Sequence, residues 1–405
     1  MNILILSQVF WPDTASVSQH LTDLAEDLSA RGHMVEVVSS RRDYENPRNV
    51  FRKKENYKGI NISRIRNTGF GKASIVGRIF DFLTFYITLF LKLFTANNVK
   101  YDLVIGMTVP PLISLLGVVA AHRKSAEFLY WVMDIQPELS ITTGYIKEGS
   151  ITAKLLLKLG DYVYRKSDKV IVLDKYMENH VVKRGAPPDR TSIIPVWPVM
   201  KEVYSGGRLE NPFRDENKLG DRIVVMYSGN HSVVHPLNTL LETIFNLRDD
   251  KRFVFVFIGG GVRKKDVTEF KLKNKLENIL QFDYQRRDKI HISLSSADIH
   301  VIIQGNNCVG LTHPNKIYGA MCVCRPVLYI GPCSSHISDI LEECHGNISV
   351  MHGEAERLME SLLVFAKTDE ANRRKVGQNN MIYVKNKYTR EKLVGEMINI
   401  IEKEG

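Results

Sequence analysis

Apolar runs alternate with amphipathic segments from the first residue of the chain. The chain opens on the apolar run MNILILSQVF, and a polar loop then leads to SQHLTDLAEDLSARGH, where Leu21, Leu24, Ala25 and Leu28 recur at helical spacing. Gly32 is typical of the residue that ends a helix, and the following MVEVVSS is typical of a strand. Repeated strand and helix units predict an α/β fold with an open, mostly parallel sheet.

The alternation forms two series separated by a polar segment. The first series continues through INISRI, YDLVIGMT, EFLYWVMD and SDKVIVLD, and the second runs from RIVVMYSGN to NISVM. Between them the chain is rich in Gly, Pro and Asn, which is typical of a linker. We therefore expect two doubly wound domains, residues 1–200 and 221–385, joined by a linker at 201–220 and facing a cleft.

The charge of the chain is concentrated in one block. The 405 residues are 44% hydrophobic and 25% charged, with a formal net charge of +10. Residues 31–100 hold fourteen Lys and Arg against five Asp and Glu, a net of +9. This block indicates an acidic partner such as an anionic surface.

The cysteines indicate a reducing compartment and no metal site. They are odd in number, lie in the C-terminal half, and follow no signal peptide: Cys308, Cys322, Cys324, Cys333 and Cys344. One residue separates Cys322 from Cys324, whereas zinc-binding pairs are separated by two to four. We expect buried thiols in a cytoplasmic protein.

An aromatic segment near residues 75–95 predicts a membrane-facing helix. RIFDFLTFYITLFLKLF, residues 78–94, is bracketed by Arg78 and Lys92, and its uncharged centre is too short to cross a bilayer. Such a helix beside the basic block favours an in-plane anchor on anionic lipid. The alternative is a buried helix under a solvated basic surface. The longer uncharged run at 103–121 contains Pro110 and Pro111, which favour a strand followed by a helix.

Nucleic acid is the other partner that a basic face suggests. The aromatic residues cluster with aliphatic residues instead of alternating with the cations, and no recognised binding motif occurs. We therefore predict no nucleic-acid partner.

Three loops follow strands and begin helices, and each offers small or polar groups suited to a phosphate. The spacing of the glycine-rich GFGKAS at 69–74 fits neither the P-loop nor the dinucleotide-binding fingerprint, so this segment is interpreted as a flexible turn. In FIGGGVRKK, residues 259–265 are either a further phosphate contact or a solvated helix start. The residues of the three loops are Thr14, Ala15 and Ser16; Gly229, Asn230 and His231; and, in LTHPNKIYGAM, Lys316.

Asp134 ends the strand in YWVMDIQPE, where its carboxylate would orient a hydroxyl or accept a proton. The alternative is a helix cap or a surface acid. The chain contains no Asp-x-Asp, so the paired ligands of a metal–diphosphate site are missing. A cation for a diphosphate leaving group must therefore come from the protein, and Lys316 suits that role.

The order of these motifs resembles glycosyltransferase family 4. The resemblance spans the chain through ILSQVFWPD, YDLVIGMTVPPL, YWVMDIQPE, VVMYSGNHS, FVFIGGG and HPNKIYGAM. It is greatest for bacterial enzymes similar to fucosaminyltransferases of O-antigen and capsule assembly, which share the elements at 134–138 and 314–316.

The resemblance implies a GT-B fold of two Rossmann-like domains, with residues 386–405 forming a helix that crosses back to the N-terminal domain. It implies a retaining, metal-independent transfer of a sugar from a nucleotide donor, with UDP the expected nucleotide and no cofactor required. The acceptor would be a lipid-linked saccharide or polyprenyl diphosphate at the inner face of the cytoplasmic membrane. The implied site residues are Asp134 and Lys316 for catalysis and Thr14, Ala15, Ser16, Gly229, Asn230, His231, Gly260, Asp283, Asn315, Lys316 and Ile317 for the donor.

The chain departs from the family at several positions. The first loop lacks the usual two glycines, Asn230 stands where an Arg is frequent, and Leu311 and Gly319 replace paired glutamates. The missing glutamates keep open a partner subunit without catalytic activity. A nucleotide-sugar 2-epimerase stays open because that class has a similar two-domain fold. The oligomeric state and the sugar are not indicated by the sequence.

Overall fold

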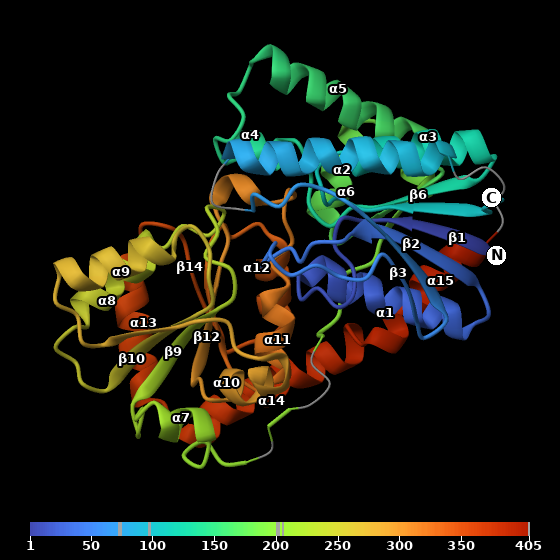
Figure 1. Ribbon diagram of the computed structural model, residues 1–405. Coiled ribbons are helices and arrows are strands. Elements are labelled where there is room, and N and C mark those ends of the chain that lie inside the picture. The colour runs from blue at the N-terminus through green and yellow to red at the C-terminus, as the bar shows by residue number, and fades with distance from the viewer. Residues whose placement is uncertain (72–74, 96–98, 200–202, 205, 404–405) are drawn as a thin grey trace. The chain divides into compact units, whose positions relative to one another are not determined.

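The structure is a computed structural model, drawn in Figure 1, and it divides into two compact units. It describes residues 1–71, 75–95, 99–199, 203–204 and 206–403. Unit 1 comprises Met1–Val196, Gly310–His313 and Glu391–Gly405, and unit 2 comprises Trp197–Val309 and Pro314–Arg390.

Unit 1 contains, within the described residues, an eight-stranded sheet in the order β3-β4-β2-β1-β5-β6-β7-β8. Neighbouring strands are parallel except β3, which pairs antiparallel with β4. The strands are β1 (Asn2–Leu6), β2 (Met34–Ser40), β3 (Lys54–Tyr57), β4 (Ile60–Ile65), β5 (Leu103–Gly106), β6 (Glu127–Trp131), β7 (Lys169–Val172) and β8 (Thr191–Ile193).

The helices of unit 1 cover both faces of this sheet. In Figure 1, α2, α3 and α5 lie along one face, and α1 and α15 lie along the other. The helices are α1 (Ser16–Ala30), α2 (Ile75–Thr95), α3 (Ile113–Lys124), α4 (Glu138–Thr142), α5 (Ile151–Lys166), α6 (Lys175–Lys183) and α15 (Arg390–Glu402).

The first strand and helix show how the sequence pattern forms this unit. In β1, Ile3 to Leu6 are fully or almost fully buried, which fits a strand covered on both faces. In α1, Leu21, Leu24, Ala25 and Leu28 are all inaccessible to solvent, so the predicted helical stripe is confirmed.

Unit 2 contains, within the described residues, a six-stranded parallel sheet in the order β11-β10-β9-β12-β13-β14. The strands are β9 (Ile223–Ser228), β10 (Phe253–Ile258), β11 (Ile279–Phe282), β12 (Ile299–Ile303), β13 (Val327–Ile330) and β14 (Ile348–Val350). The helices are α7 (Pro212–Glu216), α8 (Asn238–Asn246), α9 (Lys264–Lys273), α10 (Ile290–Ser295), α11 (Lys316–Cys322), α12 (His336–Glu343), α13 (Ala355–Lys367) and α14 (Glu370–Lys387). Short 3-10 helices cover Pro188–Arg190 in unit 1 and Arg287–Lys289 and Asn306–Cys308 in unit 2. The predicted α/β class with two doubly wound sheets is thus confirmed.

The segment expected to be a linker, 201–220, includes α7, which belongs to unit 2. Arg214 of α7 is buried, and its guanidinium lies 3.2 Å from the carboxylate of Asp298 and donates to the carbonyl of Ser296 at 2.7 Å. Residues 201–202 and 205 of that segment lie outside the described residues.

The final helix expected at 386–405 is divided between the end of α14 and all of α15. α15 belongs to unit 1, where Glu402 lies 3.4 Å from Arg31 and 2.9 Å from His33. The last two residues, 404–405, are outside the described part of the chain.

Helix α2 exposes an apolar stripe. Its side chains at 76, 79, 80, 83, 87, 90 and 91 are between 45% and 63% exposed, whereas Phe85 and Leu89 on the opposite face are fully buried. Among the described helices, including α2, none combines the length and apolar character that crossing a bilayer requires.

Candidate functional site

The amino group of Lys316 is held at one end of the sheet of unit 2. Its Nζ donates to the hydroxyl of Tyr227 at 2.6 Å and to the carbonyl of Asn230 at 3.1 Å, and lies 4.1 Å from the centre of the Tyr227 ring. Tyr227 is in β9, Asn230 follows that strand, and Lys316 is the first residue of α11. Residues 89 apart in sequence thus form one group, which we call the lysine site: Tyr227, Gly229, Asn230, His231 and Lys316.

Gly229 is required for this arrangement. Its φ of +125° is disfavoured for side-chain-bearing residues, and a Cβ there would lie 2.8 Å from Cε of Lys316. A side chain at this position would therefore displace the lysine. The structure thus brings Gly229, Asn230 and Lys316 together, and their binding of a donor stays a prediction.

Burial controls the ionisation of the lysine site. Desolvation lowers the pKa of Lys316 to about 7, so its amino group is close to half protonated at neutral pH. Burial, with a smaller contribution from Lys316, lowers the pKa of His231 to about 4 and keeps this imidazole neutral. A bound anion would restore the charge of Lys316, because an opposite charge favours the protonated form.

The glycine turn after β10 lies against the lysine site. His231 donates its backbone N–H to the carbonyl of Gly260 at 2.7 Å, and its Nδ1 lies 3.1 Å from the same oxygen. A Cβ at Gly259 would overlap the carbonyl oxygen of Gly229, and one at Gly260 would lie 3.1 Å from the ring of Tyr284. Close backbone approach therefore explains the glycines in FIGGG, and Gly260 is next to the site as expected.

The remaining donor residues expected in unit 2 differ in what they can contribute. The side chain of Asp283 is 96% exposed and lies 2.5 Å from the amino group of Lys264, whose hydrogen bond lowers the pKa of this carboxyl. Ile317 is fully buried, so it offers a ligand its backbone alone. Asn315 is the N-cap of α11, although its side chain makes no capping bond.

In unit 1, the loop before α1 is ordered by Asp13, which the sequence analysis did not single out. Its carboxylate accepts the backbone N–H of Ala15 at 3.0 Å and that of Tyr44 at 2.8 Å. Thr14 and Ser16 are exposed, and Ala15 is the N-cap of α1. An aspartate two residues before the N-cap of a predicted helix was the available signal for this role.

Asp134 lies after β6 in unit 1, half-buried. Desolvation raises the pKa of this carboxyl to about 7. The backbone at Asp134 bridges to Thr312, and Ile135 donates its N–H to the carbonyl of Leu311 at 2.9 Å. A carboxyl with this pKa can both release and accept a proton near neutral pH, which suits acid–base chemistry.

Glu138, four residues later, has a structural role instead. Its Oε1 lies 2.9 Å from Arg184 and 3.2 Å from His180, both at the end of α6. Although burial opposes it, these two groups lower the pKa of the Glu138 carboxyl, so it stays ionised. The two acids of one sequence motif therefore carry opposite pKa shifts.

Comparisons with known proteins agree with this two-unit arrangement. Residues 17–197 match the Glycosyl transferase 4-like domain. The "Probable glycosyltransferase WbjE" of Pseudomonas aeruginosa is 24% identical over 259 residues, which are 64% of this chain and 64%, just under two thirds, of WbjE. WcaI of Escherichia coli, described as a colanic acid biosynthesis glycosyl transferase, is 21% identical over 337 residues, 80% of this chain and 81% of WcaI. The chain therefore resembles the glycosyltransferases of family 4.

Solved structures extend the likeness to both units of the chain. HepE of Anabaena, solved in complex with UDP-glucose, superposes with a TM-score of 0.72 at 15% identity, covering 99% of each chain. The expected GT-B fold is thereby confirmed.

The two positions where the resemblance to family 4 leads one to expect glutamates, 311 and 319, have different surroundings. Leu311 is 6% exposed, and it contributes its carbonyl to the contact with Ile135. Gly319 is half-buried on α11, and a Cβ there would make one ordinary contact with Leu294 at 3.9 Å. Leu311 is thus a packing residue, whereas position 319 has space for a side chain.

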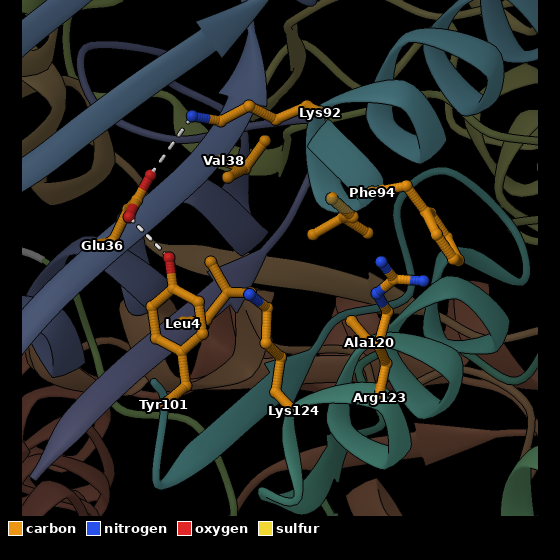
Figure 2. A pocket seen from close by; sticks show the side chains of 10 residues that line it. Leu4, Glu36, Val38, Lys92, Phe94, Tyr101, Ala120, Arg123 and Lys124 are labelled. Carbon is orange, nitrogen blue, oxygen red and sulfur yellow. Dashed lines mark hydrogen bonds and ion pairs between the residues drawn. The ribbon is translucent and has the colours of Figure 1, made fainter. Parts of the chain in front are cut away.

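A separate pocket lies over the sheet of unit 1, between the C-terminal ends of α2 and α3 (Figure 2). It encloses about 410 Å³ of empty space, including its open mouth. Glu36 accepts from Tyr101 at 2.7 Å and lies 3.6 Å from Lys92, while Arg123 stacks 4.7 Å from the ring of Phe94. Its cations thus already interact with protein groups and compensate two helix C-termini.

Proposed function

We propose that this protein transfers a sugar from a nucleoside diphosphate, UDP in the first instance, to a lipid-linked saccharide or polyprenyl diphosphate during assembly of a cell-surface polysaccharide. The observation that carries the proposal is the lysine site. Its amino group is restrained by Tyr227 and Asn230 and stands beside two glycine turns that allow a phosphate to approach the backbone.

The lysine would stabilise the leaving group. When the bond between the anomeric carbon and the β-phosphate oxygen breaks, negative charge develops on the departing diphosphate, and Lys316 would neutralise it. The acceptor oxygen would bond to the anomeric carbon on the same face, and its proton would pass to the departing phosphate. The products are a nucleoside diphosphate and a glycoside of retained configuration. We propose no metal, because the chain contains no Asp-x-Asp pair to bind one.

Asp134 would act on the acceptor. Its pKa of about 7 permits the carboxylate to orient the attacking hydroxyl and to share its proton. HepE was solved with UDP-glucose, and WcaI is described by colanic acid biosynthesis, which supports a nucleotide sugar and a surface polysaccharide.

The exposed stripe of α2 supports binding at the inner face of the cytoplasmic membrane. Seven apolar side chains recur along it at helical spacing, and the basic block of residues 31–100 lies in the same unit. Apolar insertion and attraction to anionic lipid together account for peripheral membrane binding.

The test is thermal-shift titration with UDP-, GDP-, dTDP- and ADP-linked sugars, followed by turnover of the best ligand. A ligand that binds the folded state raises Tm with its concentration. In addition, Lys316→Met should weaken nucleoside diphosphate at least about tenfold while leaving nucleoside affinity within about twofold, since one charge-assisted contact contributes about 1.5–3 kcal/mol. Equal losses for both ligands would place Lys316 away from the phosphates.

The partner-subunit alternative is favoured by one observation, the absence of carboxylates at positions 311 and 319. Binding without turnover for every donor and a panel of lipid-linked acceptors would support that alternative over the enzyme.

A further inference from the structure

A polar pocket opens where β1, β2 and β4 of unit 1 end, and we call it the strand-edge pocket. It encloses about 370 Å³ of empty space, including its open mouth. The residues that carry the argument are Gln8, Arg42, Asp43, Tyr44, Arg78 and Asp81.

Gln8 is the most informative residue of this pocket. Its side chain is 8% exposed, and its Oε1 is buried with no hydrogen-bond partner among the described residues. The backbone of Gln8 is fixed, because its N–H donates to Val109 at 2.8 Å and its carbonyl accepts from Ser40 at 3.0 Å. A buried polar atom without a partner destabilises the fold, and such an atom at the edge of a pocket indicates a ligand that supplies the missing hydrogen bond.

The two arginines of the pocket are oriented by neighbouring groups. Arg42 donates to the carbonyl of Pro47 at 2.7 Å and to that of Asn67 at 3.0 Å. Arg78 lies 3.5 Å from the hydroxyl of Tyr44 and 5.4 Å from the ring centre of Phe82. Both guanidiniums are therefore restrained, which lowers the entropy cost of binding a ligand.

Two carboxylates balance the charge of these arginines. Asp81 accepts the backbone N–H groups of Phe70 and Gly71 at 3.0 and 2.9 Å, and Asp43 accepts those of Glu45 and Asn46. With two cations and two anions, the pocket has no net charge. It therefore suits a neutral, hydroxyl-rich group better than a phosphate, which would favour an excess of cations.

Helix α2 connects this polar pocket to an apolar surface. Arg78 and Asp81 line the pocket, whereas Ile79 and Phe80 on the same turns are each 53% exposed and continue into the apolar stripe. A single helix thus presents a hydroxyl-binding face and a lipid-compatible face. An amphiphile with a sugar head and an apolar chain matches both.

We propose that the strand-edge pocket binds the sugar ring at the end of the amphiphilic acceptor. A sugar hydroxyl donates to Oε1 of Gln8, and the guanidiniums of Arg42 and Arg78 donate to other sugar oxygens. The assignment of this sugar as the acceptor rests on the proposed function. The binding itself does not, because the strand-edge pocket and the lysine site contain different residues.

The experiment measures binding of two kinds of probe to the full chain by saturation-transfer NMR and calorimetry. The first is a panel of neutral methyl glycosides of hexoses and N-acetylhexosamines, and the second is farnesyl diphosphate, which carries phosphate and lipid without sugar. At least one methyl glycoside should bind, and Gln8→Met should weaken it by about threefold to tenfold, the loss of one hydrogen bond. The Tm of Gln8→Met should be unchanged or higher, because the substitution removes an unsatisfied buried atom.

A second pair of variants keeps the test independent of that substitution. Arg78→Gln should weaken the same glycoside, whereas Arg48→Gln, an equal charge change at an exposed residue outside the pocket, should not. The proposal is overturned if no glycoside of the panel binds, if Gln8→Met leaves binding unchanged, or if farnesyl diphosphate alone binds in an Arg78-dependent way.

Parallel titration with nucleoside diphosphate separates this proposal from the proposed function. Nucleoside diphosphate binding without glycoside binding refutes the sugar pocket and leaves the transferase. Glycoside binding without any nucleotide binding refutes the transferase and retains the pocket as a saccharide site.

Discussion

Lys316 contacts Tyr227 in two ways at once: its amino group donates to the phenol oxygen at 2.6 Å and lies 4.1 Å from the ring centre. The Tyr227 hydroxyl in turn donates to the carbonyl of Asn230 at 2.8 Å, which also accepts from Lys316. The lysine is therefore fixed in position while its charge is only partly stabilised. A diphosphate would supply the missing counter-charge to a cation that is already oriented.

Binding of nucleoside diphosphate should take up protons at Lys316. The pKa of Lys316 is lowered to about 7 in the free protein, and a bound diphosphate raises it by favouring the ammonium form. Affinity should therefore fall as the pH rises above about 7, by up to about tenfold per unit until the pKa of the complex is reached. Calorimetry at pH 7.5 in buffers of different ionisation enthalpy measures the uptake, and the Lys316→Met variant reports protons exchanged by the nucleotide itself. Equal uptake in both proteins would contradict the assignment.

Tyr227→Phe should weaken nucleoside diphosphate by about threefold to tenfold. The substitution keeps the ring but removes the oxygen that holds the lysine, a hydrogen bond with a net contribution of about 0.5–1.5 kcal/mol. Tyr329→Phe is the matched control, since its hydroxyl is also buried and bonded, to Gln304 and Ser335. Both variants should lose some stability, but only Tyr227→Phe should change the Kd. A Kd that changes equally in the two would indicate a general effect of loosened packing.

Local sequence patterns predicted the elements, and most of the lysine site, but not its tyrosine. Gly229, Asn230 and Lys316 follow strands or begin helices, where polar and small residues are conspicuous. Tyr227 belongs to the apolar run VVMYS, and an aromatic residue at a strand end cannot be told from a core residue by pattern alone. Its role arises from a contact with a residue 89 positions away.

The acids of the motif at 134–138 show the same limit. Asp134 was the candidate by position, and Glu138 follows four residues later in the same motif. The charge of Glu138 is balanced by His180 and Arg184, which lie about 40 residues further along the chain. The partners that separate a structural acid from a titrating one are long-range, so the sequence motif could not distinguish them. The segment that forms α7 was likewise expected to be linker, because its residues are mostly polar. The buried ion pair of Arg214 with Asp298 joins residues 84 positions apart, so the local sequence does not indicate it.

Asp134→Asn should raise Tm at pH 8 and remove the contribution of Asp134 to the pH dependence of turnover near pH 7. The folded-state pKa of Asp134 is about 7 against 3.8 for the unfolded chain, so the folded state holds the proton more tightly. This carboxyl therefore costs stability as the pH rises from about 4 through about 7, and Asn removes that cost. Thermal unfolding at pH 5 and pH 8 should show a clearly larger gain at the higher pH.

Glu138→Gln provides the opposite case. His180 and Arg184 lower the pKa of the Glu138 carboxyl, so the ionised carboxylate stabilises the fold at pH values above its pKa in the unfolded chain. Replacing Glu138 by Gln should therefore lower Tm at both pH 5 and pH 8. A fall in Tm at pH 8 for Asp134→Asn, matching that of Glu138→Gln, would show that Asp134 is a structural acid as well.

Replacing Phe80, Leu83 and Ile87 of α2 by Ser should release the protein from vesicles of anionic lipid without unfolding it. These side chains are 49–56% exposed, so they contribute little to the core, whereas each apolar side chain transferred into lipid stabilises binding by up to about 1.5–3 kcal/mol. The partition coefficient measured by co-sedimentation should fall at least about tenfold at unchanged Tm.

Two control variants separate membrane contact from folding. Leu272, Val364 and Ile382 in unit 2 are similarly exposed, and their replacement by Ser should leave vesicle binding intact. Phe85→Ser should instead lower Tm sharply, because Phe85 is fully buried. Unchanged vesicle binding in the α2 variant would show that this stripe does not contact the membrane.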